Sequence, residues 1–433
     1  MLKTPTYKNI LKGSVLLVFL ALAVFNTAFS QTNGGVANWW YFGDSCSMNF
    51  NNLTPNVLNN SGLNGLLSPQ SISDKQGNLL FYGNPHVLYD QSHNPMQNGA
   101  LTNIPTNSGY GSQPMTLIIP KPCSPEVYYY FYCEVSNVLT MQWDLKYAEI
   151  NMSFNGGLGA VTFKDSLLRT DVSPAIDGTL HSNNTDYWVV SRARNNNEYQ
   201  SIQVTNNGVS VSPVVSYSGS SATPVNANDI GQLRFSPDGT KFAHVLYNLL
   251  GVSPNNRLEL FTFDKSNGFV SHILDFAPPN NVTSFWFNHF LYAEFSPSGQ
   301  YLYTCFPGAL PANSIVQYDL QAGSNTTVSN SGVLVPNTGS PNSIAYPRRA
   351  PDGKIYWSTG NATSTMLHVM HNPNDAVPNV NFQPNSINVG RPTGAGLPSF
   401  INAAIANHSI TFSDSCATNT IDFSMVDTNF IDS

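Results

Sequence analysis

Residues 235–242 read FSPDGTKF, residues 295–302 read FSPSGQYL, and residues 350–356 read APDGKIY. In each copy a proline fixes the backbone at the first corner of a turn, and a glycine can take the positive φ that the turn needs. Aromatic and β-branched residues follow each glycine, as is typical of a strand. The copies therefore predict strand–turn–strand units, and we interpret their aspartates as turn formers rather than as a set of functional carboxylates.

Similar strand signals recur along the chain at a nearly constant spacing. Runs rich in aromatic and β-branched residues begin near positions 79, 127, 186, 241, 300 and 353, at intervals of 48 to 59 residues. This period, without helical periodicity, is what a propeller blade of four antiparallel strands needs. The 31 glycines and 29 prolines argue against a mostly helical fold. We predict an all-β fold, a seven-bladed β-propeller, with six or eight blades as alternatives.

The ends of the predicted ring set the domain limits. Residues 38–43 (NWWYFG) and 397–401 (LPSFI) read as terminal strands that share one blade, which would pair two otherwise exposed edges. The propeller is therefore expected to span residues 31–405. Residues 409–416 and 420–423 then read as two short strands, too few to bury a core, so we expect residues 406–433 to open a further domain that this chain truncates.

The first thirty residues have the order of a secretory signal peptide. Three lysines precede a twelve-residue apolar run at 14–25, and small residues end the segment at Ser30. The apolar run is too short to span a bilayer comfortably. We predict a signal peptide over residues 1–30, cleavage after Ser30, and a secreted, extracellular or cell-surface location without membrane insertion after cleavage.

Charge excludes some classes of partner. Only 10% of residues are charged, and removal of the three lysines of the signal segment changes the net charge from −7 to −10. An acidic chain without a basic run is not suited to nucleic acid or an anionic membrane as its main partner.

Five cysteines are too few for a disulfide scaffold in a chain of this length. Cys123 and Cys133 bracket an expected strand and are either paired with each other or buried as free thiols. Cys416 has no neighbouring cysteine within a hundred residues, so its partner is expected outside this chain.

An ordered set of short motifs covers most of residues 38–402. It comprises WYFG at 40–43, GNLLFY at 77–82, LKYAEINM at 145–152, NGGLG at 155–159, HNPN at 371–374, NFQPN at 381–385 and GLPSFI at 396–401. The set resembles the N-terminal propeller of large secreted or surface proteins of gliding-type Gram-negative bacteria, many of them exported by the type IX system. The resemblance implies that an immunoglobulin-like domain of the PKD type begins near Cys416. It implies no catalytic residues.

Sequence motifs for catalysis or cofactor binding were not found, so we name no catalytic, cofactor-binding or metal-binding residues and no cofactor. His368 and His371 lie three apart, and we expect them in an exposed loop rather than at a metal. The aromatic run at 128–132 is expected to be a buried strand, with a stacking platform for sugars as the alternative.

Two classes of function remain. The first is a non-catalytic interaction module for adhesion or surface assembly, which binds a protein or glycan at the cell surface or in the extracellular matrix through loops such as 51–70, 216–229 and 321–344. The second is a propeller hydrolase or lactonase with its site in the central channel. Acidic residues are few, and we expect most of them in turns, so we favour binding over catalysis.

Overall fold

The computed structural model describes residues 35–52, 54–63, 68–102, 115–137, 139–140, 142–194, 196–220, 229–248, 257–280, 283–284, 290–306, 309–310, 314–336, 344–359, 363–394, 396–401, 410–415 and 420–425. The chain divides into two units, Met1–Asn33 and Gly34–Ser433, and the account below concerns the second. The predicted signal peptide and its cleavage site lie outside the described residues.

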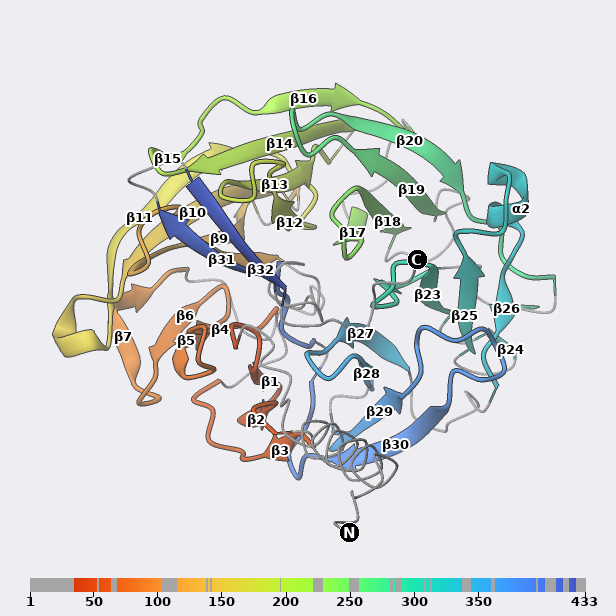
Figure 1. Cartoon of the computed structure of the whole chain (residues 1–433), viewed down its shortest axis with the longest axis horizontal. Coiled ribbons are helices and arrows are strands. Elements are labelled where there is room, and N and C mark those ends of the chain that lie inside the picture. The colour runs from red at the N-terminus through yellow and green to blue at the C-terminus, as the bar shows by residue number, and fades with distance from the viewer. Residues whose placement is uncertain are drawn as a thin grey trace, which may run out of the picture. The chain divides into compact units, whose positions relative to one another are not determined.

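The second unit is a β-propeller whose sheets follow one another around a ring (Figure 1). In the described residues helix is confined to two short elements, η1 (Asn155–Gly157) and α2 (Asn325–Ser329). No helix in this described part is long and apolar enough to cross a membrane. The prediction of an all-β propeller is confirmed.

The first half of the ring holds three sheets of unequal size. They are a three-stranded sheet of β1 (Trp39–Phe42), β2 (Cys46–Asn49) and β3 (Asn56–Val57); an eight-stranded sheet of β4 (Gln70–Ser73), β5 (Leu79–Gly83), β6 (Val87–Asp90), β7 (Pro95–Ala100), β8 (Thr116–Pro120), β9 (Val127–Asn137), β10 (Gln142–Asn151) and β11 (Ala160–Arg169); and a five-stranded sheet of β12 (Asp177–Leu180), β13 (Tyr187–Arg192), β14 (Glu198–Thr205), β15 (Gly208–Val209) and β16 (Val214–Tyr217).

The second half holds three four-stranded sheets and one short strand pair. The sheets are β17 (Asp229–Phe235), β18 (Lys241–Asn248), β19 (Arg257–Phe263) and β20 (Val270–Asp275); β22 (Ala293–Phe295), β23 (Tyr301–Phe306), β25 (Ser314–Asp319) and β26 (Val333–Leu334); and β27 (Ala345–Arg349), β28 (Ile355–Ser358), β29 (Met366–Met370) and β30 (Phe382–Asn388), and the pair is β21 (Thr283–Ser284) with β24 (Ala309–Leu310).

The repeated turns have the predicted form. Gly239, Gly299 and Gly353 have φ values of 69°, 73° and 76°, the left-handed region in which glycine is favoured. The Asp238 carboxylate accepts a hydrogen bond from the backbone N–H of Thr240 at 3.0 Å. Its role is therefore that of a turn former, as the sequence indicated.

The core consists of apolar side chains packed between neighbouring sheets. Phe242 and Phe261 stack with ring centroids 4.8 Å apart, and Tyr199 from the preceding sheet lies 5.0 Å from Phe261. All three are fully buried. Similar clusters at the other seams hold the sheets against one another, and this fixes the positions of the inner strands.

The number and form of the blades differ from the prediction. The described strands do not make seven separate four-stranded blades, because the first sheet has three strands and two meanders share the eight-stranded sheet. The meanders β4–β7 and β8–β11 join through a parallel pairing of Gln97 with Ala160. Strands β9, β10 and β11 have 10 or 11 residues, and this length carries β11 outward to the edge of β7.

The prediction that strands from both ends of the propeller share one blade is also wrong. Residues 397–401 form no strand, although Phe400 stacks on Trp40 of β1 at 6.3 Å. Pro398 has no N–H to donate to a strand ladder, and the neighbouring Ser399 side chain is held by two arginines. The segment therefore reaches the first sheet through side-chain packing.

Cys123 and Cys133 are not paired with each other. Cys123 is disulfide-bonded, whereas Cys133 is a buried free thiol on β9. Cys416 lies outside the described residues. The two strands expected after residue 405 are present as an antiparallel pair, β31 (Ile410–Ser415) and β32 (Thr420–Met425).

Candidate functional site

Charged side chains from four consecutive sheets meet in the middle of the ring. Asp177 lies on β12, Arg234 on β17, Glu294 on β22 and Arg348 on β27, which are the first strands of their sheets and contact one another in that order. Each of the four side chains is at least 95% buried. Sequence analysis placed acidic residues mainly in turns, and this is wrong for Asp177 and Glu294.

The four groups alternate in sign and form a chain of ion pairs. Arg234 Nη1 lies 3.4 Å from Asp177 Oδ2, and Arg234 Nε lies 3.6 Å from Glu294 Oε2. Arg348 Nη1 lies 3.5 Å from the same Glu294 oxygen. Burial and the nearby charge of Arg234 lower the pKa of Arg348 to about 9, and burial raises the pKa of Asp177. Both acids are therefore engaged by cations.

Ser399, in the C-terminal segment, connects the two arginines of this ion-pair series. Its Oγ accepts hydrogen bonds from Arg234 Nη1 at 3.1 Å and from Arg348 Nη2 at 2.8 Å. The cavity beside Arg348 and Ser399 has a volume of about 10 Å³. This is room for about one water molecule, so this cavity is too small for an organic ligand.

A much larger groove lies where three turns come together. Its volume is about 700 Å³, within the usual range of ligand sites. The turn after β4 contributes Lys75 and Gln76, the turn after β8 contributes Lys121, and the turn after β12 contributes Asn184. Each turn ends the first strand of a meander, and first strands run in the same direction around a propeller. The three turns therefore share one face of the ring.

The groove combines aromatic and polar groups. Tyr128 and Tyr187, from the second strands β9 and β13, line it together with Ile72 and Ile401. Burial, with the nearby charges of Asp74 and Glu126, raises the pKa of Tyr128 to about 12, so its phenol is neutral and can donate a hydrogen bond. Aromatic rings beside amide, hydroxyl, ammonium and carboxylate groups suit a hydroxyl-rich ligand that both stacks and hydrogen-bonds.

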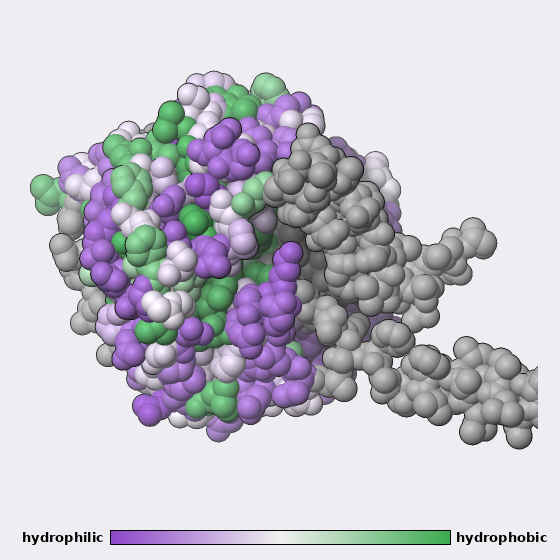
Figure 2. Space-filling model, turned by 60° about the vertical axis from the view of Figure 1, so that its left-hand side comes forward, coloured by the Kyte–Doolittle hydropathy of each residue, from purple (hydrophilic) through white to green (hydrophobic). Residues whose placement is uncertain are grey.

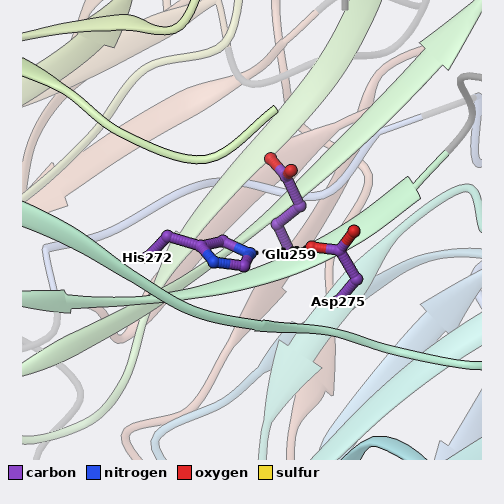
Figure 3. A group of neighbouring side chains, drawn as sticks. All are labelled: Glu259, His272 and Asp275. Carbon is purple, nitrogen blue, oxygen red and sulfur yellow. Dashed lines mark hydrogen bonds and ion pairs between the residues drawn. The ribbon is translucent and has the colours of Figure 1, made fainter. Parts of the chain in front are cut away.

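A third group lies at the outer part of the ring. His272 and Asp275 on β20 face each other, and Glu259 on β19 lies beside them (Figure 3). One possible ligand atom from each residue lies within 4.8 Å of the other two. His272 Nε2 and Asp275 Oδ1 are 2.7 Å apart, and Arg257 Nη1 lies 3.3 Å from Asp275 Oδ2. Sequence analysis missed this group.

The histidine pair singled out in the sequence is not in an exposed loop. His368 is fully buried on β29, and its Nδ1 accepts a hydrogen bond from Asn385 N at 2.9 Å. His371 is half-buried just after the same strand. β29 is buried on both of its faces, with Leu367 and Val369 buried on either side of His368, and this accounts for the difference.

Other sequence predictions fare differently. The aromatic run at 128–132 is a buried strand, as predicted, and Tyr128 at its start also reaches the groove. The stretches 51–70, 216–229 and 321–344 contribute none of the described residues that line the groove.

On the side shown in Figure 2, apolar side chains are dispersed among polar ones, which is ordinary for a protein surface.

Comparison with known proteins adds little beyond the fold. No protein-family model and no curated protein matches the chain. Among solved structures, a glucose dehydrogenase is 12% identical over 68% of this chain and 94% of that chain (TM-score 0.37), and a puromycin hydrolase is 9% identical over 81% and 53% (TM-score 0.39). The β-propeller domain of the trilobed protease from Pyrococcus furiosus is 10% identical over 59% and 82% (TM-score 0.28). At such identities and scores, these likenesses carry no argument about a site or an activity.

Proposed function

We propose that this chain is a non-catalytic interaction module that binds a short glycan in the groove formed by the turns after β4, β8 and β12. The observation that carries the proposal is the groove itself, with its volume of about 700 Å³ and its lining of Tyr128, Tyr187 and polar turn residues. Binding at such a groove needs shape, stacking and hydrogen bonds, and no convergent acid and base.

The arrangement of the central charges favours binding over a hydrolase or lactonase in the channel. A catalytic carboxylate must contact its substrate, and Asp177 and Glu294 are instead engaged by Arg234 and Arg348. The cavity beside them holds about 10 Å³, which is far too small for a lactone, an ester or a sugar ring. Catalysis there would require displacement of the segment that carries Ser399.

The cellular location of this module and the domain that follows it are proposed from the sequence. We propose that the chain is exported through its first thirty residues and acts at the cell surface or in the extracellular matrix, in adhesion or assembly. Residues 406–433 then begin a PKD-type domain, as the resemblance to surface proteins of gliding-type bacteria implies.

A glycan array tests the proposal directly. The full chain, labelled at the N-terminus of the mature protein, is expected to retain one group of related glycans. Tyr187→Ala is expected to abolish this retention because it removes an aromatic face from the groove, while Tyr217→Ala should not. Tyr217 is 69% exposed and belongs to β16, away from the groove. If the chain binds proteins or peptides but no glycan, its ligand belongs to another class, and the proposal is contradicted.

A further inference from the structure

A β-bulge places His272 and Asp275 on the same face of the edge strand β20. Residues three apart on a regular strand point to opposite faces. Here Asp275 pairs with Glu259, Leu274 with Leu260, and His272 with Phe261, so Ile273 is the extra residue. Bulges of this kind re-aim side chains and are frequent beside functional sites.

The Glu259 carboxylate completes this face and is only partly satisfied. Glu259 is 1% exposed. Its Oε1 accepts a hydrogen bond from Ser220 N at 2.9 Å, whereas its Oε2 is buried without a hydrogen-bond donor. A buried carboxylate oxygen without a partner is costly, and a bound cation would remove that cost.

We propose that Glu259, His272 and Asp275 form a zinc-binding site at the seam between the sheets of β12–β16 and β17–β20. This inference is independent of the proposed glycan binding. One imidazole nitrogen and two carboxylate oxygens suit zinc, which binds mixed nitrogen and oxygen ligands, better than calcium or magnesium, which prefer oxygen alone. Three protein ligands leave a fourth tetrahedral position for water.

The distances require only side-chain adjustment. Zinc bonds of about 2.0–2.2 Å in a tetrahedral arrangement set ligand atoms roughly 3.3 Å apart. The present separations run from 2.7 Å between His272 Nε2 and Asp275 Oδ1 to no more than 4.8 Å within the group. Zinc would replace the direct His272–Asp275 contact. The half-exposed Arg257 side chain would leave Asp275 and turn into solvent.

The seam gives the site a structural consequence. The segment after β16 lies against it, since Ser218 Oγ accepts a hydrogen bond from His272 N at 2.7 Å and Ser220 N donates to Glu259. Arg192 from β13 donates to Ser220 O at 3.2 Å, so the five-stranded sheet contacts the same segment. Zinc would therefore bind the edge strand β20 more firmly to its neighbour.

The test is titration of the full chain, freed of metal by chelation, with zinc chloride in a calorimeter. About one equivalent should bind, and calcium or magnesium should not compete. His272→Ala and Asp275→Asn, both at exposed positions, should weaken zinc binding by more than about tenfold. Thermal unfolding without metal shows that these variants are folded.

Matched controls come from a second histidine–aspartate turn. His181 and Asp186 lie together after β12, where the Asp186 carbonyl accepts a hydrogen bond from His181 N. His181→Ala and Asp186→Asn should leave zinc binding unchanged. Absence of zinc binding to the wild-type chain would overturn the proposal. So would unchanged affinity in His272→Ala, or loss of binding in the control variants instead.

Discussion

Arg234 and Ser399 stand 165 positions apart in the chain and are joined by a hydrogen bond of 3.1 Å in the middle of the ring. Ser399 also accepts a hydrogen bond from Arg348, so one hydroxyl connects the C-terminal segment to two inner strands. The contact replaces the strand pairing that was expected to close the ring. It fixes the C-terminal segment by polar contacts that depend on buried charge.

Ser399→Ala is expected to lower the free energy of unfolding by about 1–3 kcal/mol, because two buried guanidinium groups lose an acceptor. Urea denaturation followed by tryptophan fluorescence measures the change. Ser266→Ala, at an exposed turn position, is the control and should change stability by less than about 0.5 kcal/mol. Equal effects of the two variants would show that the Ser399 contacts contribute nothing.

Arg234→Met is expected to destabilise the fold by about 3–5 kcal/mol, because it leaves Asp177 and Glu294 buried without one of their cations. Adding Asp177→Asn should restore part of this loss, since the unpaired charge is then removed. A double-mutant cycle gives the coupling energy. Strictly additive effects of the two substitutions would contradict the ion-pair chain.

Stability should fall as the pH rises above the ordinary pKa of a glutamate, about 4.3. Burial raises the pKa of Glu259, so the folded state holds a proton that the unfolded state has already lost. The contribution is present at low pH and is lost as the pH rises through the raised pKa. Glu259→Gln should flatten this part of the profile in chelator-treated protein. An unchanged slope in the variant would assign the effect to other groups.

The free thiols should be slow to react in the folded protein. Burial raises the pKa of Cys46 and of Cys305 to about 12 and raises the pKa of Cys133 as well, so little thiolate is present at neutral pH. When the protein is unfolded without reductant and treated with an alkylating reagent, mass spectrometry should find Cys133 alkylated. Cys123 should be unmodified because it is in a disulfide. A peptide that links Cys123 to Cys133 would contradict the structure.

The sequence was sufficient for the fold class because its signals are local. Each proline–glycine turn, such as the one between Phe235 and Phe242, and the aromatic run after it predict a single hairpin. A propeller repeats such hairpins. The blade number and the closure depend on long-range pairing. The meeting of Gln97 with Ala160 and the path of residues 397–401 leave no periodic mark in the sequence.

The candidate sites were harder to predict for the same reason. Asp177 and Glu294 look like scattered acids until the ring brings their strands together. His272 and Asp275 have the wrong spacing for one face of a regular strand, and the bulge at Ile273 is not readable from composition. The groove is built from three turns, each of which reads as an ordinary connection.

The central claim is that the groove binds a glycan, and calorimetric titration with the glycan that the array selects tests it most directly. The wild-type chain should bind at one site, and Tyr187→Ala should weaken binding by about tenfold or more, equivalent to about 1.4 kcal/mol. Tyr217→Ala should bind like the wild type. Equal affinity of the wild type and Tyr187→Ala, or turnover of the glycan during the titration, would contradict the account.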